Sequence, residues 1–321
     1  KSGYAGRLRR SAPIKASSMK ISVIFVGELH DNGFNQCALE GVKQFQRTEG
    51  AGVVDVVSGI PYDPAAMDAA LRNAAGLSDG VVFIGGQGNR VTPDVADAFP
   101  DRAFAIVQGN VTCSNIASYD VLQEQSAFLA GVFAARMTRT GTVGHLSGHR
   151  VVPGLKGRAA FAAGVHSADE SVRLVSGFCG TQDDSAVTEA WTTAMAGEGA
   201  DIIFTMLNAA RAGATRACRT TGTHQIGNAA DWCAIDPEIF VASALARIDL
   251  GVMRAISDMQ SGFRPDEIVR LGIRDDAVSL TMRQDVPQPV RQEIAELARQ
   301  IADGSFPVAT TYEGPEFEVA A

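Results

Sequence analysis

Short apolar runs alternate with helix-like segments along most of the chain. From Met19 onward the runs are KISVIFVG, GVVDVVSG, GVVFIGG and RAFAIVQG, and segments with helical spacing follow the first three at 35–49, 64–75 and 91–98. The apolar residues in each run are consecutive instead of alternating with polar ones, which is typical of parallel strands that helices cover on both faces. The pattern therefore predicts an α/β domain in which strands and helices alternate.

A second series of the same kind begins near residue 122. A mostly apolar helix over 122–137 precedes the runs TVGHLSG, RLVSGF, DIIFTML and HQIG. The rest of the chain predicts a helix over 247–260, a strand over 278–282 and a helix over 288–302 that begins at Pro-Gln-Pro and is stopped by Gly304. Because these pieces are too few for a third domain, we expect them to complete the first two.

The composition is that of a soluble globular protein, with 46% hydrophobic and 20% charged residues. A formal net charge of -8, with no cluster of Lys and Arg after Arg10, argues against a nucleic-acid partner, because phosphate binding needs clustered positive charge. The longest apolar stretches, such as 21–26 and 201–207, are strand-sized and shorter than the roughly 20 residues of a membrane helix. The basic leader 1–18 has no apolar run, and we interpret it as an added leader or a disordered tail outside the fold.

Neither the cysteines nor the histidines have the spacing of a catalytic or metal site. The five cysteines contain no C-x-x-C pair, which favours unpaired thiols, with a Cys218–Cys233 disulfide as the alternative. The five histidines show no H-E-x-x-H spacing, and no G-x-S-x-G elbow is present. Asp183 and Asp184 are adjacent and point in different directions, so they are a poor carboxylate pair. We therefore predict no catalytic residue, no metal and no cofactor.

Five segments carry a resemblance to a known family. In chain order they are GELHDNGFNQCALEGV, FAIVQGNV, QEQSAFLAGVFAARMTRTGTVGHLSG, GEGADIIF and HQIGNAADW. Together they resemble the BMP (basic membrane lipoprotein) family of solute-binding proteins of ABC transporters, whose best known members bind purine nucleosides. The resemblance implies an extracytoplasmic and monomeric receptor, lipid-anchored in some members, that passes a small ligand to a membrane permease.

The resemblance also implies a type I periplasmic-binding-protein fold. In this fold, two doubly wound parallel-sheet lobes are joined by three crossovers, and the ligand lies between them. The expected division is 19–115 plus 241–271 for lobe 1 and 116–240 plus 272–321 for lobe 2. Ligands of open parallel sheets bind outside the carboxyl ends of the strands, and this rule independently places the site in the cleft.

The candidate ligand contacts of lobe 1 follow its strands. Phe34 offers a stacking face and Asn35 an amide that matches the edge of a heteroaromatic ring, although a helix cap with its hydrophobic staple is the alternative for this pair. Gln87 lies in a glycine-rich turn, for which a dinucleotide site is disfavoured because that fingerprint belongs after the first strand. The full set for this lobe is Asp31, Phe34, Asn35, Gln87 and Gln108, the last with a supporting role as its alternative.

The candidates of lobe 2 also follow strands. Phe178 and Trp232 are expected to form an aromatic sandwich with Phe34 across the cleft, with ordinary core packing as the alternative. Arg211 has a solvated helix face as its alternative. His145 and His149 with Arg150 are weaker candidates at the end of the first strand. The full set for this lobe is Phe178, Gln182, Asn208, Arg211, Asn228 and Trp232.

Two departures from the family pattern concern recognition of a sugar. Where nucleoside-binding relatives carry an Asp, this chain has Ala229, and where they carry a Lys it has Ala246, with Arg247 adjacent. A site without these groups should prefer a ligand without ribose, since a buried polar group lacking its partner costs about 1–3 kcal/mol. The expected ligand is a purine nucleobase or similar flat heterocycle. The alternatives are a nucleoside receptor, a sensory domain of the same fold and, least favoured, a nucleoside or base hydrolase.

Overall fold

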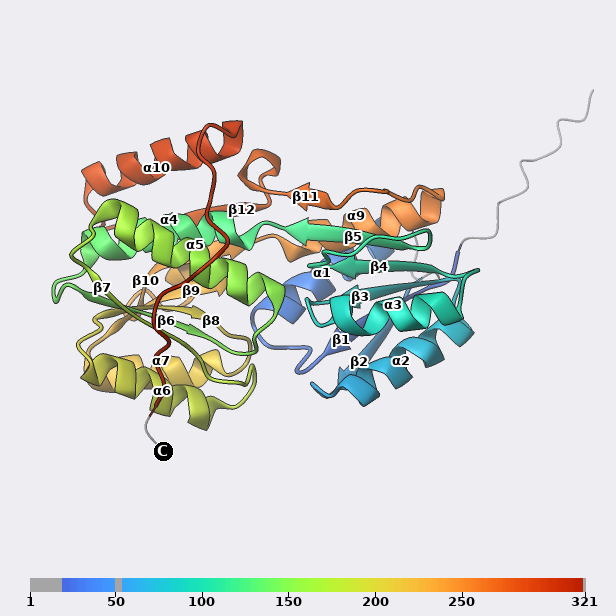
Figure 1. The fold of residues 1–321 in the computed structure, drawn as a ribbon, viewed down its shortest axis with the longest axis horizontal. Coiled ribbons are helices and arrows are strands. Elements are labelled where there is room, and N and C mark those ends of the chain that lie inside the picture. Colours follow the sequence, from blue (N-terminus) through green and yellow to red (C-terminus); the bar gives the residue numbers. More distant parts are fainter. Residues whose placement is uncertain (1–18, 50–53, 320–321) are drawn as a thin grey trace, which may run out of the picture.

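The computed structural model describes residues 19–49 and 54–319, which form two α/β lobes side by side (Figure 1). Each lobe is built around a six-stranded sheet, so the predicted architecture of two wound lobes is confirmed. The leader 1–18 lies outside the described residues. Within the described part of the chain, no helix combines the length and the apolar character that crossing a bilayer requires.

The sheet of lobe 1 has the order β11-β5-β4-β3-β1-β2, and all its neighbouring strands pair in parallel. Strands β1, β3 and β4 are fully buried, as their consecutive apolar residues predict, whereas β2 lies at the edge with most of its residues partly or fully exposed. The expectation that helices bury every strand is therefore wrong for β2. The strands are β1 Ile21–Val26, β2 Val54–Ile60, β3 Gly80–Ile84, β4 Ala103–Val107, β5 Ile116–Val121 and β11 Val269–Leu271.

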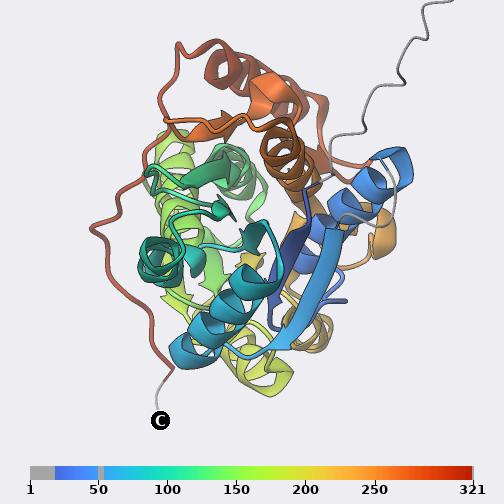
Figure 2. The same cartoon turned by 90° about the vertical axis from the view of Figure 1, so that its right-hand side faces the viewer.

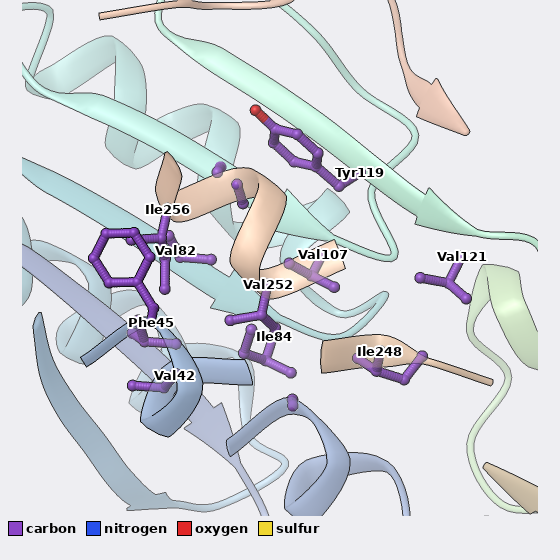
Figure 3. Close-up of a cluster of buried hydrophobic side chains, with 14 of the residues drawn as sticks. Val42, Phe45, Val82, Ile84, Val107, Tyr119, Val121, Ile248, Val252 and Ile256 are labelled. Carbon is purple, nitrogen blue, oxygen red and sulfur yellow. The ribbon is translucent and has the colours of Figure 1, made fainter. Parts of the chain in front are cut away.

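Two pairs of helices cover the two faces of this sheet (Figure 2). α1 (Phe34–Glu49) and α9 (Ile248–Ser261) pack on one face, and α2 (Pro64–Leu77) and α3 (Gly88–Ala98) on the other. Figure 3 shows the first of these interfaces, in which the aliphatic side chains of α9 lie between α1 and the strands. The residues of α9 come from the last third of the chain, so lobe 1 is completed by a segment far in sequence from its first five strands.

The sheet of lobe 2 has the order β12-β10-β9-β8-β6-β7, and only β12 runs antiparallel, against β10. α4 and α5 cover one face, with α10 outside α4, and α6 and α7 cover the other (Figure 1). The strands are β6 Thr142–Ser147, β7 Arg173–Phe178, β8 Ile202–Met206, β9 His224–Ala229, β10 Phe240–Ala246 and β12 Val278–Met282; the helices are α4 Gln123–Met137, α5 Val152–Ala168, α6 Ser185–Gly197, α7 Arg211–Thr221, α8 Trp232–Ile235 and α10 Gln288–Asp303.

The chain after α10 forms a strap, residues 305–319, that descends across α5 toward α6 (dark red in Figure 1). The Phe317 N–H donates to Ser176 O in the edge strand β7, and the Phe317 ring packs against Trp191. Glu316 forms ion pairs with Arg150 and with the nearly buried Arg158. The strap therefore ties the end of the chain to the loop between β6 and α5.

The boundaries between the lobes differ from those expected. β5 belongs to the sheet of lobe 1 although the expected division placed 116 onward in lobe 2, and β10 belongs to lobe 2 although 241 onward was assigned to lobe 1. The chain crosses between lobes after Val121, after Ala246 and, through a 3-10 turn at Ile273–Asp275, before β12. Each crossover follows a complete strand, because each strand needs the hydrogen bonds of its own sheet.

Candidate functional site

The carboxyl ends of strands from both lobes face one another across an inner cavity with about 580 Å³ of empty space, part of it open to solvent. None of the described residues that line it carries a carboxylate, an ammonium or a guanidinium. They are Val26, Phe34, Asn35, Tyr62, Ile84, Gly85, Gly86, Gln87, Gln123, Ser147, His149, Val151, Pro153, Gly154, Gln182, Met206, Asn208 and Asn228.

The two lobes approach closely around this cavity. A Cβ atom added to Gly86 of lobe 1 would lie 2.7 Å from Cδ of Pro153 in lobe 2, so no larger residue fits there. The Tyr62 and His149 rings have centroids 4.6 Å apart, and the Asn208 Nδ2 donates to the Tyr62 hydroxyl at 3.4 Å. These contacts join the lobes directly and describe a closed cleft.

Asp31 and Asn35 shape the wall of lobe 1 in different ways. Asp31 is buried, and its carboxylate accepts from the N–H groups of Gly33, Asn35 and Gln36 at 2.8–3.0 Å. It therefore satisfies the free N–H groups at the start of α1 and does not line the cavity. The Asn35 amide donates both hydrogens to backbone carbonyls, of Val26 at 2.8 Å and Glu28 at 2.9 Å. Only its carboxamide oxygen, an acceptor, remains for a ligand.

The amides of lobe 2 present the opposite chemistry. Asn228 Oδ1 accepts from Arg211 Nη2 at 2.9 Å, and Gln182 Oε1 accepts from the Asn208 N–H at 3.1 Å. Because both oxygens are engaged, the NH₂ groups of Asn228 and Gln182 are the parts available to a ligand. One wall of the cavity thus offers the Asn35 acceptor, and the facing wall offers these two donors together with the Asn208 amide oxygen, an acceptor.

Arg211 supports this wall and does not line the cavity. Its guanidinium is buried under Trp232, 4.2 Å from the ring centroid, and donates to Leu207 O and Asn228 Oδ1. Burial lowers the pKa of Arg211 to about 10, and the nearby Asp31 carboxylate opposes this shift. The alternative of a solvated helix face is wrong, and so is direct placement in the cavity: Arg211 orients Asn228.

The prediction that Phe178 and Trp232 form an aromatic sandwich with Phe34 is also wrong. Phe178 lies outside the cavity between the guanidinium groups of Arg150 and Arg158, at 4.7 and 4.9 Å from its ring centroid. Trp232 packs on Phe240 and donates its Nε1 hydrogen to Asn228 O. Phe178 ends β7 and Trp232 follows β9, as expected, but neither ring lines the inner cavity.

Gln108 is a structural residue in this fold. Its side-chain oxygen accepts from the Val121 N–H at 2.8 Å, and its amide donates to Val121 O at 3.2 Å. It is buried with a positive φ of 69° and ties the end of β4 to the end of β5. Gln108 therefore has the supporting role that was its alternative. The predicted residues that do line the cavity are Phe34, Asn35, Gln87, Gln182, Asn208 and Asn228.

Tyr62 is the main wall residue that the sequence did not suggest. It follows β2, packs on His149 and reaches Asn208 across the cleft. Burial and the nearby Asp183 and Asp31 carboxylates raise the pKa of its hydroxyl, which therefore remains protonated at neutral pH. A tyrosine two residues after the end of a strand was the available signal in the sequence.

A buried histidine lies behind the cavity. His145 in β6 lies between two hydroxyls, with its Nε2 3.0 Å from Ser147 Oγ and its Nδ1 3.1 Å from Ser176 Oγ. Burial, and to a smaller extent Arg158, lower the pKa of His145 to about 3. The ring is neutral and positions the Ser147 hydroxyl that lines the cavity.

The positions linked to sugar recognition carry no polar group toward the cavity. Ala229 and Ala246 are buried at the ends of β9 and β10 and are not among the lining residues. The Arg247 guanidinium instead pairs with Asp249 at 2.7 Å. All five cysteines are free thiols, so the disulfide alternative is not realised. Among the described residues, no group of three or more His, Cys, Asp or Glu is arranged to hold a metal ion.

A family model described as "ABC transporter substrate-binding protein PnrA-like", the Bmp family, matches residues 18–304. The chain belongs to the Bmp family. It is similar to Basic membrane protein D of Borreliella burgdorferi (strain JD1), with 23% identity over 286 residues, 85% of this chain and 81% of the relative. It is also similar to Basic membrane protein B of Borreliella afzelii (strain PKo), with 24% identity over 318 residues, 94% of this chain and 90% of the relative.

Solved structures share the fold of this Bmp family member. The solute-binding protein of an ABC transporter system from Aeropyrum pernix K1 aligns with a TM-score of 0.81 and 22% identity over 92% of this chain and 94% of its own. A transcriptional activator of the comK gene from Bacillus halodurans aligns with a TM-score of 0.71 and 19% identity over 90% and 99% of the two chains.

As a Bmp family member, the chain is a solute-binding protein of the ABC-transporter type, which takes a small ligand and delivers it to a permease. Proteins of this family act outside the cytoplasm and are substrate-binding proteins, not enzymes. The two closed lobes and the cavity between them are the arrangement that this role requires.

Proposed function

We propose that this solute-binding protein carries a purine nucleobase, or a heterocycle of similar size, without an attached sugar. The observation that supports this proposal is that amide side chains on opposite walls of the inner cavity offer a hydrogen-bond acceptor and hydrogen-bond donors. Asn35 offers an acceptor from lobe 1, and Asn228 and Gln182 offer donors from lobe 2. The edge of a purine has both donors and acceptors, so it can bridge the lobes as the amides require.

The uncharged lining supports a neutral ligand. An ionised group taken from water into this cavity would meet no opposite charge, and such burial is strongly unfavourable unless the charge is paired. The ring of Phe34 provides a stacking surface for a flat ligand, an interaction worth about 0.5–1.5 kcal/mol beyond the area that it buries. Together these features favour a flat, neutral and polar-edged molecule.

The same cavity offers little to ribose. The two alanines at the family's sugar-binding positions present methyl groups, and neither lines the cavity. Sugar hydroxyls held there would lose their hydrogen bonds to water without replacement, at a cost of about 1–3 kcal/mol for each group.

Ligand binding must be coupled to movement of the lobes. In the closed cleft, the space that a water-sized sphere can reach in the inner cavity is about 60 Å³, room for a few waters. A purine ring therefore enters only when the lobes open or Tyr62 and His149 move aside. A ligand that contacts both lobes then stabilises the closed state, which we propose the permease recognises. We expect the working form to be a monomer, lipid-anchored at the membrane.

Calorimetric titration with adenine, hypoxanthine, adenosine and inosine tests the proposal. We expect micromolar or tighter binding of at least one base, and at least about tenfold weaker binding of its nucleoside. Phe34→Ala should weaken binding of the base about tenfold by removing the stacking surface. Phe263→Ala is the matched control, because Phe263 is 54% exposed and lies outside the cavity.

Two results would contradict the proposal. Tighter binding of the nucleosides than of the bases would show that the sugar is recognised after all. Failure of all four purines to bind the wild-type protein, with melting curves unchanged, would exclude the purine class.

A further inference from the structure

A second and larger cavity opens beside the inner one. This outer cavity lies between the first turns of α2 and α3 in lobe 1 and of α5 in lobe 2. The space that a water-sized sphere can reach in it is about 650 Å³, against about 60 Å³ in the inner cavity. In this closed arrangement the inner cavity has little free space, and substantial room lies directly outside it.

The two cavities are adjacent and share part of their walls. Tyr62, Gly86, Gln87, His149 and Val151 line both of them. The Tyr62 and His149 rings, 4.6 Å apart, form the partition together with the Gly86 backbone. Rotation of either ring would join the inner and outer spaces without further opening of the lobes.

The outer cavity differs chemically from the inner one. Most of the surface of its walls is apolar, with aliphatic side chains from Ala65, Met67, Val91, Val152 and Leu155, although polar and charged residues also line it. Apart from Met67, these aliphatic residues are not fully buried.

Two of the four charged residues that line the outer cavity have partners within the described part of the chain. Asp68 pairs with Arg72 at 2.8 Å, and Arg150 pairs with Glu316 at 3.0 Å. The exposed Arg90 and Asp94 also line the outer cavity and have opposite charges. The space therefore has no excess of one charge and suits an apolar group.

We propose that the outer cavity is a second subsite of the ligand site and takes an apolar substituent carried by the heterocycle. The proposal rests on the function proposed above, since the ring must occupy the inner cavity. Tyr62 and His149 act as the gate through which the substituent passes. The ligand class is then a substituted heterocycle: a flat polar head between the amides, joined to a hydrocarbon group that covers the aliphatic walls of the outer cavity.

A pair of probes distinguishes the head from the substituent. Adenine has the head alone, and N6-benzyladenine adds an apolar ring to it. We expect the wild-type protein to bind N6-benzyladenine at least about tenfold more tightly than adenine in calorimetric titrations, because the added group removes apolar surface from water.

Substitutions in the outer cavity test whether the higher affinity for N6-benzyladenine arises there. Leu155→Asp and Val91→Asp place a carboxylate in the outer cavity from opposite lobes, and each should abolish the advantage of N6-benzyladenine while leaving adenine binding unchanged. Leu77→Asp is the control, because Leu77 is 64% exposed in α2 and lies outside both cavities. Melting curves of the unliganded variants verify that each is folded.

The outcomes separate the two proposals. Equal affinities for the two probes in the wild-type protein, or an advantage that survives both outer-cavity variants, would overturn the subsite and leave the nucleobase proposal standing; the outer cavity would then be a solvent-filled entrance. Failure of N6-benzyladenine to bind a protein that binds adenine or hypoxanthine would also overturn the subsite. Failure of both probes and of hypoxanthine would overturn the nucleobase proposal and, with it, the subsite.

Discussion

His145 is the residue whose burial has the clearest consequence for pH. Its pKa is lowered to about 3, first by burial and then by Arg158, whereas an unfolded histidine titrates near 6.5. Below about pH 6.5 the unfolded chain therefore binds one more proton than the folded protein, so stability falls on acidification until the pH approaches about 3. Between pH 7 and pH 5 this single group should account for about 2 kcal/mol of lost stability.

The His145→Asn variant should lack this contribution. We expect its free energy of unfolding, from urea titrations, to fall by about 2 kcal/mol less between pH 7 and pH 5 than that of the wild-type protein. His166→Asn is the control, because His166 is exposed on α5, and it should keep the wild-type dependence. Parallel curves for His145→Asn and the wild type would show that His145 is not held neutral.

At the residue scale, chain order predicted part of the site. Asn35 and Asn208 come after strands and Asn228 lies near the carboxyl end of β9, and in a two-lobed fold the carboxyl ends of both sheets face the cleft, so these residues are expected to line it. Topology does not determine the direction of a side chain after the strand ends. Phe178, the last residue of β7, is therefore at the correct strand end but contacts Arg150 and Arg158 outside the inner cavity and is only partly buried.

Among the elements, the strap has a testable role in stability. Glu316 is the acidic partner of Arg158, whose side chain is only 7% exposed, and it also pairs with Arg150. Glu316→Ala should lower the free energy of unfolding by about 1–3 kcal/mol, since a buried polar group left without its partner costs about that much. Urea unfolding at pH 7 measures the change.

Glu318→Ala is the control for the strap, because Glu318 is exposed and close in the chain. Its effect should stay within about 0.5 kcal/mol, as for most surface substitutions. Equal effects of the two variants would show that the pairing with Arg158 does not hold the strap in place.

Elements with a continuous apolar run were predictable, and those without one were not. β1, β3 and β4 contain such runs and were located. β5, with the sequence IASYDV, and β10, with FVASALA, mix apolar with polar or small residues and were missed. Both are nevertheless almost entirely buried, because neighbouring strands and helices cover small side chains as well as large ones. Because β5 and β10 were not predicted, the expected lobe boundaries were placed before these strands instead of after them.

For the whole molecule, Lys156 links the lobes close to a crossover. Its Nζ lies 2.8 Å from Asp120 Oδ2 in lobe 1 and 2.7 Å from Glu124 Oε1 at the start of α4. Lys156→Met would leave two carboxylates facing each other where the lobes meet, which favours separation of the lobes. A shift of about 1 kcal/mol toward the open state would weaken ligand binding roughly fivefold.

Small-angle scattering of the unliganded protein measures the opening directly, and we expect a larger radius of gyration for Lys156→Met than for the wild type. Lys43→Met is the control, because Lys43 pairs only with Glu40 on the surface of α1. An unchanged radius of gyration together with unchanged affinity would exclude a role for Lys156 in closing the cleft.

The three crossovers also determine when each lobe can be completed during synthesis. When synthesis has reached the end of β10 at Ala246, five strands of each sheet exist, but the face of lobe 1 that α9 will cover is still bare. Lobe 2 is completed later still, because β12 and α10 follow α9 in the chain. The nascent chain therefore exposes a broad apolar surface until its last residues emerge, a state prone to aggregation and suited to chaperone binding.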